Sequence, residues 1–303
     1  MTLDVAYTWV DDRSPGYADE MRAHARSRHD LNPNRTRDNL ELLRFSLRSL
    51  AAYAPWVGNV HLFTRRPQLP AWLDTRHPRL RITHHDEVMD AALLPTFNSF
   101  AIVQHLHRLP GISQRFVYFE DDMLLGAPVG PRDFMAYPRL ARTSRVAHAD
   151  DSPWTASIAG SNRLLDERFG RTHRWVNHFP VLMETDLWAE LHAQWPQALE
   201  RTRASRFRSH TDVAPEFLYF HYARARGRTT EASLAASYRE CFYFPLENRL
   251  AQMRLQRAAV ALLRPKFITL NDNFDAHPDP AVESYVRALL GRWLPRPSAF
   301  ERS

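Results

Sequence analysis

The segment RFVYFEDDM, Arg115 to Met123, places three carboxylates directly after a run of aromatic and β-branched residues. The apolar run predicts a buried strand. Adjacent like charges repel one another, and dehydrating each one without a partner is costly, so the cluster needs a cation or free access to water. The segment therefore indicates a strand that ends at a cation site. The alternatives are a cap for a following helix and a solvated turn.

The same pattern, a short apolar strand with a polar end, recurs along the first half of the chain. The apolar periodicity predicts strands at 3–10, 59–64, 79–84 and 115–120, alternating with helical segments at 17–29, 38–54 and 95–109. Such alternation predicts a parallel sheet, which binds ligands at the carboxyl ends of its strands. Polar residues that fall at these ends are Asp11, His84, His85 and the carboxylates of 120–122.

Helix signals dominate the middle third of the chain, so it is predicted to form a helical lobe. A strand is expected within it at 237–244. A strand at 264–270, ending in Asn271, Asp272 and Asn273, and a helix at 280–290 are expected to return to the first part. We therefore expect an α/β core at 1–149, a mainly helical lobe at 150–264 and a returning segment at 265–303, all forming one unit.

The composition excludes several classes of function. The net charge of +6 comes almost wholly from arginine, with Lys266 the only lysine, and the arginines are scattered among acidic residues. No continuous basic stripe results, which argues against nucleic acid and favours anionic phosphate ligands. Dinucleotide, phosphate-loop, serine-elbow and zinc-site motifs are all missing from the sequence, which removes the common dehydrogenase, kinase and hydrolase interpretations.

The sequence also predicts a location. One cysteine, Cys241, cannot form an internal disulfide, and neither a signal peptide nor a membrane-spanning run is visible. We expect a soluble cytoplasmic protein. The segment RLQRAAVALLR, 254–264, has an apolar face with flanking arginines, so it predicts either a core-packed helix or peripheral contact with an anionic membrane at its inner face.

Alternation along a strand predicts which carboxylates act together. Glu120 and Asp122 should project to one face while Asp121 points away, unless a turn has begun. Hard oxygen ligands of this kind suit Mg²⁺ or Mn²⁺, which can hold a diphosphate. Arg208, in FRSHTD, precedes a helix that Asp212 is expected to cap, and its planar fork suits phosphate. At most one of the adjacent histidines His84 and His85 should reach such a site.

Four blocks of sequence together resemble one known family. They are DVAYTWVD (4–11); RDN (37–39) through LRFSLRSL, YAPWV and LPTFNSFAI to the acidic pair; NHFPVLM with RFRSHTD; and KFITLNDNFD with PRPSAF. In this order they resemble the Stealth family of sugar-phosphate transferases. That family includes bacterial capsule phosphotransferases and the catalytic part of N-acetylglucosamine-1-phosphotransferase. The blocks span nearly the whole chain.

The resemblance implies a fold and a reaction. The fold would be a nucleotide-sugar-transferase-like (GT-A-like) core with the helical lobe. A saccharide hydroxyl would attack the sugar-bound phosphate of a nucleotide-sugar donor, usually UDP-linked such as UDP-GlcNAc, to form a phosphodiester and release the nucleoside monophosphate. Such a reaction serves capsule, exopolysaccharide or cell-wall polymer synthesis. The alternatives are a metal-dependent glycosyltransferase, which releases the diphosphate, and a non-catalytic module that binds sugar nucleotides.

The resemblance also implies roles for single residues. Asp121 and Asp122, with Glu120, would form the metal and catalytic centre, His178 would be the general base as a neutral imidazole, and Arg208 would hold a phosphate oxygen. Residues implied on the donor side are Asp11, Asn39, Asn98, Ser99, Asp272 and Asn273.

Two positions depart from the family pattern, which has Asn at 120 and Glu at 103 where this chain has Glu120 and Val103. Our hypothesis is that Glu120 supplies the charge that Val103 lacks. The segment 37–50 also looks one residue longer than the family pattern, so Arg44 and Arg48 are not given roles.

Overall fold

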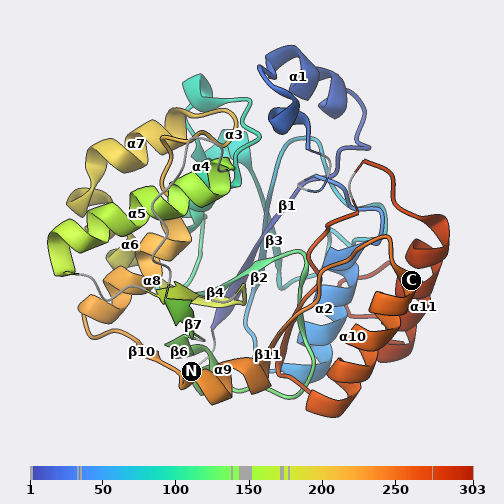
Figure 1. Ribbon diagram of the computed structural model, residues 1–303. Helices are drawn as coiled ribbons and strands as arrows, with labels where there is room; N and C mark the ends of the chain where they lie inside the picture. The colour runs from blue at the N-terminus through green and yellow to red at the C-terminus, as the bar shows by residue number, and fades with distance from the viewer. Residues whose placement is uncertain are drawn as a thin grey trace.

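A five-stranded sheet with the order β3-β2-β1-β4-β9 forms the centre of the computed structural model (Figure 1). The structure describes residues 3–32, 34, 36–137, 139–142, 152–170, 174–176, 178–274 and 276–302. The strands are β1 (Asp4–Trp9), β2 (Val60–Thr64), β3 (Leu80–His84), β4 (Arg115–Glu120) and β9 (Val181–Glu184). The first four are parallel and β9 is antiparallel to β4. The predicted α/β fold with a mostly parallel sheet is confirmed.

Helices cover both faces of this sheet, which explains why β1, β2 and β4 are buried along nearly their whole length. Figure 1 shows α5 to α8 on one side and α2, α10 and α11 on the other. The helices are α1 (Tyr17–His24), α2 (Leu42–Tyr53), α3 (His85–Val88), α4 (Ser99–Val103), α5 (Pro153–Phe169), α6 (Thr185–Gln194), α7 (Pro196–Ala204), α8 (Pro215–Ala225), α9 (Leu234–Glu240), α10 (Leu250–Leu263) and α11 (Pro280–Trp293). Short 3-10 turns lie at Arg28–Leu31, Ala91–Leu93, Leu106–Arg108 and Pro131–Phe134.

A second sheet begins where the first ends. The chain leaves β4 at Glu120 and enters β5 (Met123–Leu125) after two residues. β5 pairs with β12 (Phe267–Thr269), which pairs with β11 (Cys241–Tyr243). The strand predicted at 264–270 therefore exists, but it joins this second sheet and not the central one. Two further pairs join β6 (Ala136–Tyr137) to β10 (Thr230–Glu231) and β7 (Arg139–Arg142) to β8 (Arg174–Val176).

Several predicted elements differ in extent. The helix expected at 17–29 ends at His24 and is followed by a 3-10 turn, and the helix expected at 95–109 breaks into α4 and a second 3-10 turn. The prediction of a strand at 237–244 was wrong for its first half. Residues 237–240 are the end of α9, and the strand is β11. Ser233 begins that helix by accepting a hydrogen bond from the Ala236 amide.

A second hydrophobic core, separate from that of the central sheet, lies under α10 and α11. Met253 and Val260 of α10 are buried there, while Leu255 and Leu262 on its other face are exposed. The core-packed helix expected at 254–264 is thus confirmed for one face. None of the helices in the described part of the chain combines the length and apolar composition that crossing a bilayer requires.

Candidate functional site

The three carboxylates lie at the junction of the two sheets. Thr8 of β1 is in register with Glu120 of β4, so the carboxyl ends of these neighbouring strands meet. The amide of Leu270, just after β12, donates to the Asp122 carbonyl at 2.9 Å. Strand pairing on both sides thus fixes the turn that carries Asp121 and Asp122.

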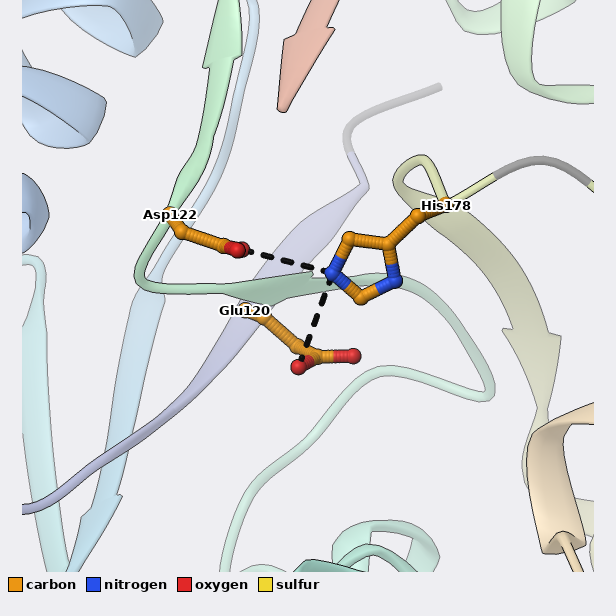
Figure 2. Close-up of side chains that lie close together, drawn as sticks. All are labelled: Glu120, Asp122 and His178. Carbon is orange, nitrogen blue, oxygen red and sulfur yellow. Dashed lines mark ion pairs between the residues drawn. The ribbon is translucent and has the colours of Figure 1, made fainter. Parts of the chain in front are cut away.

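Glu120 and Asp122 point toward the ring of His178, which comes from the segment just before β9 (Figure 2). The His178 Nε2 atom lies 3.4 Å from Asp122 Oδ1 and 3.8 Å from Glu120 Oε2. Thr269 of β12 holds the His178 backbone by donating to its carbonyl at 2.7 Å. We call Glu120, Asp122 and His178 the acidic cluster. Asp121 lies outside it. Because Asp121 and Asp122 lie in a turn, this grouping comes from the turn and not from the alternation of a continuing strand.

The electrostatics of the acidic cluster leave a deficit of positive charge. Burial would lower the pKa of His178, but the facing carboxylates of Glu120 and Asp122 raise it to about 10. Burial raises the pKa of Glu120 and, together with the Asp122 charge, raises that of Asp121 well above its ordinary value. One imidazole ring thus faces two carboxyl groups, with a third beside them, and burial favours the uncharged form of Glu120 and Asp121 unless a cation is bound.

This donor set fits a divalent cation. One ligand atom from each member of the acidic cluster lies within 4.8 Å of the other two. Carboxylate oxygens suit Mg²⁺ and Mn²⁺, and an imidazole nitrogen is better matched to Mn²⁺ or another transition metal than to Mg²⁺. Glu120, Asp122 and His178 could therefore hold such an ion.

Arg208 presents a hydrogen-bond donor to the same region. Its Nη2 donates to Ser99 Oγ at 2.5 Å, and its guanidinium lies 4.4 Å from the centre of the Phe100 ring. Its buried Nε has no hydrogen-bond partner within the described ranges. A buried cationic N–H without an acceptor is unfavourable, so this group is suited to an anionic ligand.

Glu216, in the first turn of α8, is a site residue that the sequence analysis missed. Burial raises its pKa to about 8, the Glu120 charge adds to the rise, and Arg208 and His178 oppose it. An acidic residue in the first turn of a helix is ordinarily explained by the helix dipole. The pattern Pro215-Glu216 therefore gave no functional signal, and only the packing of α8 reveals its place.

A cavity of about 1190 Å³ joins these groups. Ligand sites for drug-sized molecules are typically roughly 300–1,000 Å³, so this cavity is larger than a typical site for one such molecule. His85 lies on its wall, and His84 is not among the lining residues. The predicted site residues on the wall are Ser99, Glu120, Asp121, Asp122, His178, Arg208, Asp272 and Asn273.

Three predicted donor-side residues make other contacts and are not among the residues that line this cavity. The carboxylate of Asp11 pairs with Arg13 at 3.0 Å. Asn39 donates to Glu283 of α11. Asn98 is fully buried and caps α4 by accepting from the Phe100 amide at 3.1 Å. Their contacts in the structure are with other parts of the protein, and their roles toward a donor stay predictions.

Asp212 has a different role from the predicted one. The N-cap of α8 is Ala214, without a side-chain cap, so Asp212 does not begin that helix. Instead it accepts hydrogen bonds from Ser205 Oγ at 2.7 Å, the Ser209 amide at 2.9 Å and Asn98 Nδ2 at 2.9 Å. Asp212 and Asn98 together hold the loop that positions Arg208.

The RDN block, 37–39, connects three parts of the fold. Arg37 Nη1 lies 3.4 Å from Asp272 Oδ2 on the cavity wall, a contact that the sequence analysis did not predict. Asp38 accepts from Trp9 Nε1 at 2.9 Å and from the Leu42 amide at 3.1 Å, which ties the end of β1 to the start of α2. Burial raises the pKa of Asp38 to about 6.

Known proteins match this chain in sequence. A family model described as Stealth protein CR2, conserved region 2, matches residues 35–143, and Stealth protein CR3, conserved region 3, matches residues 177–225. An exopolysaccharide phosphotransferase of Streptomyces coelicolor is 37% identical over 99% of this chain and 52% of its own length. A capsular polysaccharide phosphotransferase of Neisseria meningitidis serogroup A is 28% identical over 99% of this chain and 57% of its own. The chain thus spans about half the length of these relatives.

Among solved structures, the galactosyltransferase LgtC in complex with donor and acceptor sugar analogues has a TM-score of 0.46 and 12% identity, with 96% of each chain covered. The two conserved regions of sequence contain the elements of the site described above. CR2 includes Arg37, Ser99 and the 120–122 carboxylates, and CR3 includes His178, Arg208 and Glu216. With this agreement between the sequence matches and the geometry of the site, the chain belongs to the Stealth family.

Proposed function

We propose that this chain transfers a sugar-1-phosphate from a nucleotide sugar, UDP-linked in the first instance, to a hydroxyl of a saccharide acceptor. The observation that carries the proposal is the acidic cluster beside Arg208 in one large cavity. Relatives matching the whole of this chain are named as phosphotransferases of capsular and exopolysaccharides, which supports the same reaction class.

The reaction needs charge to be controlled at the diphosphate. The acceptor oxygen forms a bond to the phosphorus that carries the sugar, and the bond from that phosphorus to the bridging oxygen breaks. The nucleoside monophosphate then leaves with the bridging oxygen. Glu120, Asp122 and His178 are the proposed ligands of Mg²⁺ or Mn²⁺, which when bound would neutralise charge on the phosphates. The free Nε–H of Arg208 is the proposed donor to a phosphate oxygen.

The acceptor hydroxyl must also lose its proton. His178 was predicted as the base, but with a pKa near 10 it is a cation at neutral pH while both carboxylates face it. A base role for His178 therefore requires that Glu120 and Asp122 have another positive partner. Glu216 faces the same groups, and its pKa of about 8 lets it exchange a proton near neutral pH. We propose Glu216 as the second candidate for this step.

The nucleotide that is released tests the proposal. Purified protein is incubated with UDP-GlcNAc and other UDP-sugars, with Mg²⁺ or Mn²⁺ and a mixture of bacterial oligosaccharides, and UMP and UDP are separated by chromatography. We expect UMP from the wild type, none from Asp122→Ala, and unchanged release from Glu200→Gln, an exposed carboxylate of α7. Release of UDP would assign a glycosyltransferase, and donor binding without release of either nucleotide would assign a binding module.

A further inference from the structure

Exposed aromatic rings line the cavity at α9 and β11. Tyr238 of α9 and Tyr243 of β11 are 59% and 43% exposed, and both line the cavity together with Phe242. We call Tyr238, Phe242 and Tyr243 the aromatic wall. Large aromatic rings usually pack away from water. Rings that stay exposed on a cavity wall are suited to a ligand with apolar faces.

Strand register brings the aromatic wall close to the acidic cluster. Tyr243 is paired with Thr269 of β12, and Thr269 is paired with Met123 of β5, the residue after Asp122. Two strand spacings separate Tyr243 from Met123, which is about 10 Å. A molecule lying on this wall can therefore reach the acidic cluster.

The cavity also has a wall at α1, to which Tyr17 and Phe97 contribute. There, Tyr17 of α1 and Phe97 pack edge to face, with ring centres 5.5 Å apart. Figure 1 shows α1 and α9 at opposite edges of the molecule. The cavity, which the acidic cluster also lines, therefore extends from α1 to α9. A two-substrate transfer needs such an arrangement, with one substrate on each side of the reacting phosphate.

The chemistry of the aromatic wall favours a saccharide. Pyranose rings have apolar C–H faces that pack on aromatic rings, and their hydroxyls bond to amides and phenols of the kind that Asn271 and Tyr243 present in this part of the cavity. We propose that Tyr238, Phe242 and Tyr243 form a stacking subsite for the sugar units of the acceptor and direct its hydroxyl toward the acidic cluster. The assignment of this saccharide as acceptor rests on the proposed function.

The subsite is tested by measuring saccharide binding and donor binding separately. Wild type, Tyr238→Ala, Tyr243→Ala and Tyr238→Phe are applied to an array of bacterial capsular and exopolysaccharide fragments, and UDP-GlcNAc binding with Mn²⁺ is measured by calorimetry. Leu255→Ala is the control, because Leu255 is 71% exposed on α10 and is not among the residues that line the cavity. Thermal unfolding confirms that each variant is folded.

We expect both alanine variants to bind the fragments at least tenfold more weakly, with Tyr238→Phe and Leu255→Ala within twofold of wild type and donor binding unchanged. The subsite is wrong if no fragment binds the wild type, or if the alanine variants bind as well as it does. Fragment binding that depends on the tyrosines, without UMP release, would keep the subsite and reject the proposed reaction. UMP release, together with fragment binding that does not depend on the tyrosines, would keep the proposed reaction and reject the subsite.

Discussion

Replacing Glu301 by glutamine should lower the free energy of unfolding by about 2–3 kcal/mol, because this side chain closes a buried ion-pair network. Its carboxylate is 2% exposed and accepts from Arg44 Nε at 2.6 Å, Arg48 Nε at 2.8 Å and Arg48 Nη2 at 2.7 Å. The network joins the C-terminal PRPSAFE segment to α2, and gives Arg44 and Arg48 a structural role that the sequence analysis left open.

The magnitude follows from the titration of Glu301. Burial opposes its ionisation, but hydrogen bonds from Arg48, Arg44 and the Ser298 amide lower its pKa from 4.5 to about 2. This lowering of the pKa by about 2.5 corresponds to about 3.4 kcal/mol of folding free energy. Arg44 is 31% exposed, so water screens part of this interaction and the expected loss is smaller. For a chain of this size, the melting temperature should fall by about 5 °C.

Urea unfolding at several pH values tests this reasoning, with Glu200→Gln as the matched control. Because the folded pKa of Glu301 is lowered, its contribution is complete above the unfolded value near 4.5 and disappears as the pH falls toward 2. The stability difference between wild type and Glu301→Gln should therefore be full at pH 7 and shrink below pH 4.5. Equal stability at pH 7, or a difference that stays constant down to pH 3, would refute the argument.

Three further changes probe the site and its supports. Phe179→Ala should cost about 3–5 kcal/mol in urea unfolding, because the ring is 1% exposed beside His178; a loss below 1 kcal/mol would contradict its role in the core. Asn98→Ala should cost about 1–3 kcal/mol and speed hydrogen exchange of the loop that carries Arg208, and unchanged exchange there would show that Asn98 does not hold it. Glu120→Gln should move the pKa of His178 below about 10 in an NMR titration, since one of the two carboxylates that raise it is lost; an unchanged value would remove Glu120 from the acidic cluster.

The strand at 115–120 and the carboxylates that follow it could be predicted from the sequence. β4 ends at Glu120, and Asp121 and Asp122 lie in the turn before β5, so the alternation expected for a continuing strand does not apply to them. The turn is what groups Glu120 and Asp122 with His178 and leaves Asp121 outside. The parallel sheet could also be predicted, from the alternation of strands and helices along the chain. This pattern is local in sequence, and packing reinforces it.

Contacts between distant segments could not be predicted in this way. β12 shows the same apolar pattern whether it joins the central or the second sheet, and only its pairing with Met123–Leu125 distinguishes the two. Asn39 lies in a block that resembles a functional motif, yet its side chain faces Glu283, 244 residues away in sequence. Glu216 had an ordinary explanation as a helix-dipole residue. In each case the deciding information is which element packs opposite, which a single sequence does not contain.

Binding of Mn²⁺, followed by electron paramagnetic resonance with and without UDP-GlcNAc, tests most directly whether the acidic cluster holds a cation that in turn holds the donor. We expect one Mn²⁺ per wild-type chain, bound more tightly when UDP-GlcNAc is present, and at least tenfold weaker binding in Asp122→Asn, with Glu200→Gln unchanged. Equal Mn²⁺ affinity in wild type and Asp122→Asn, or an affinity that UDP-GlcNAc does not alter, would contradict the account.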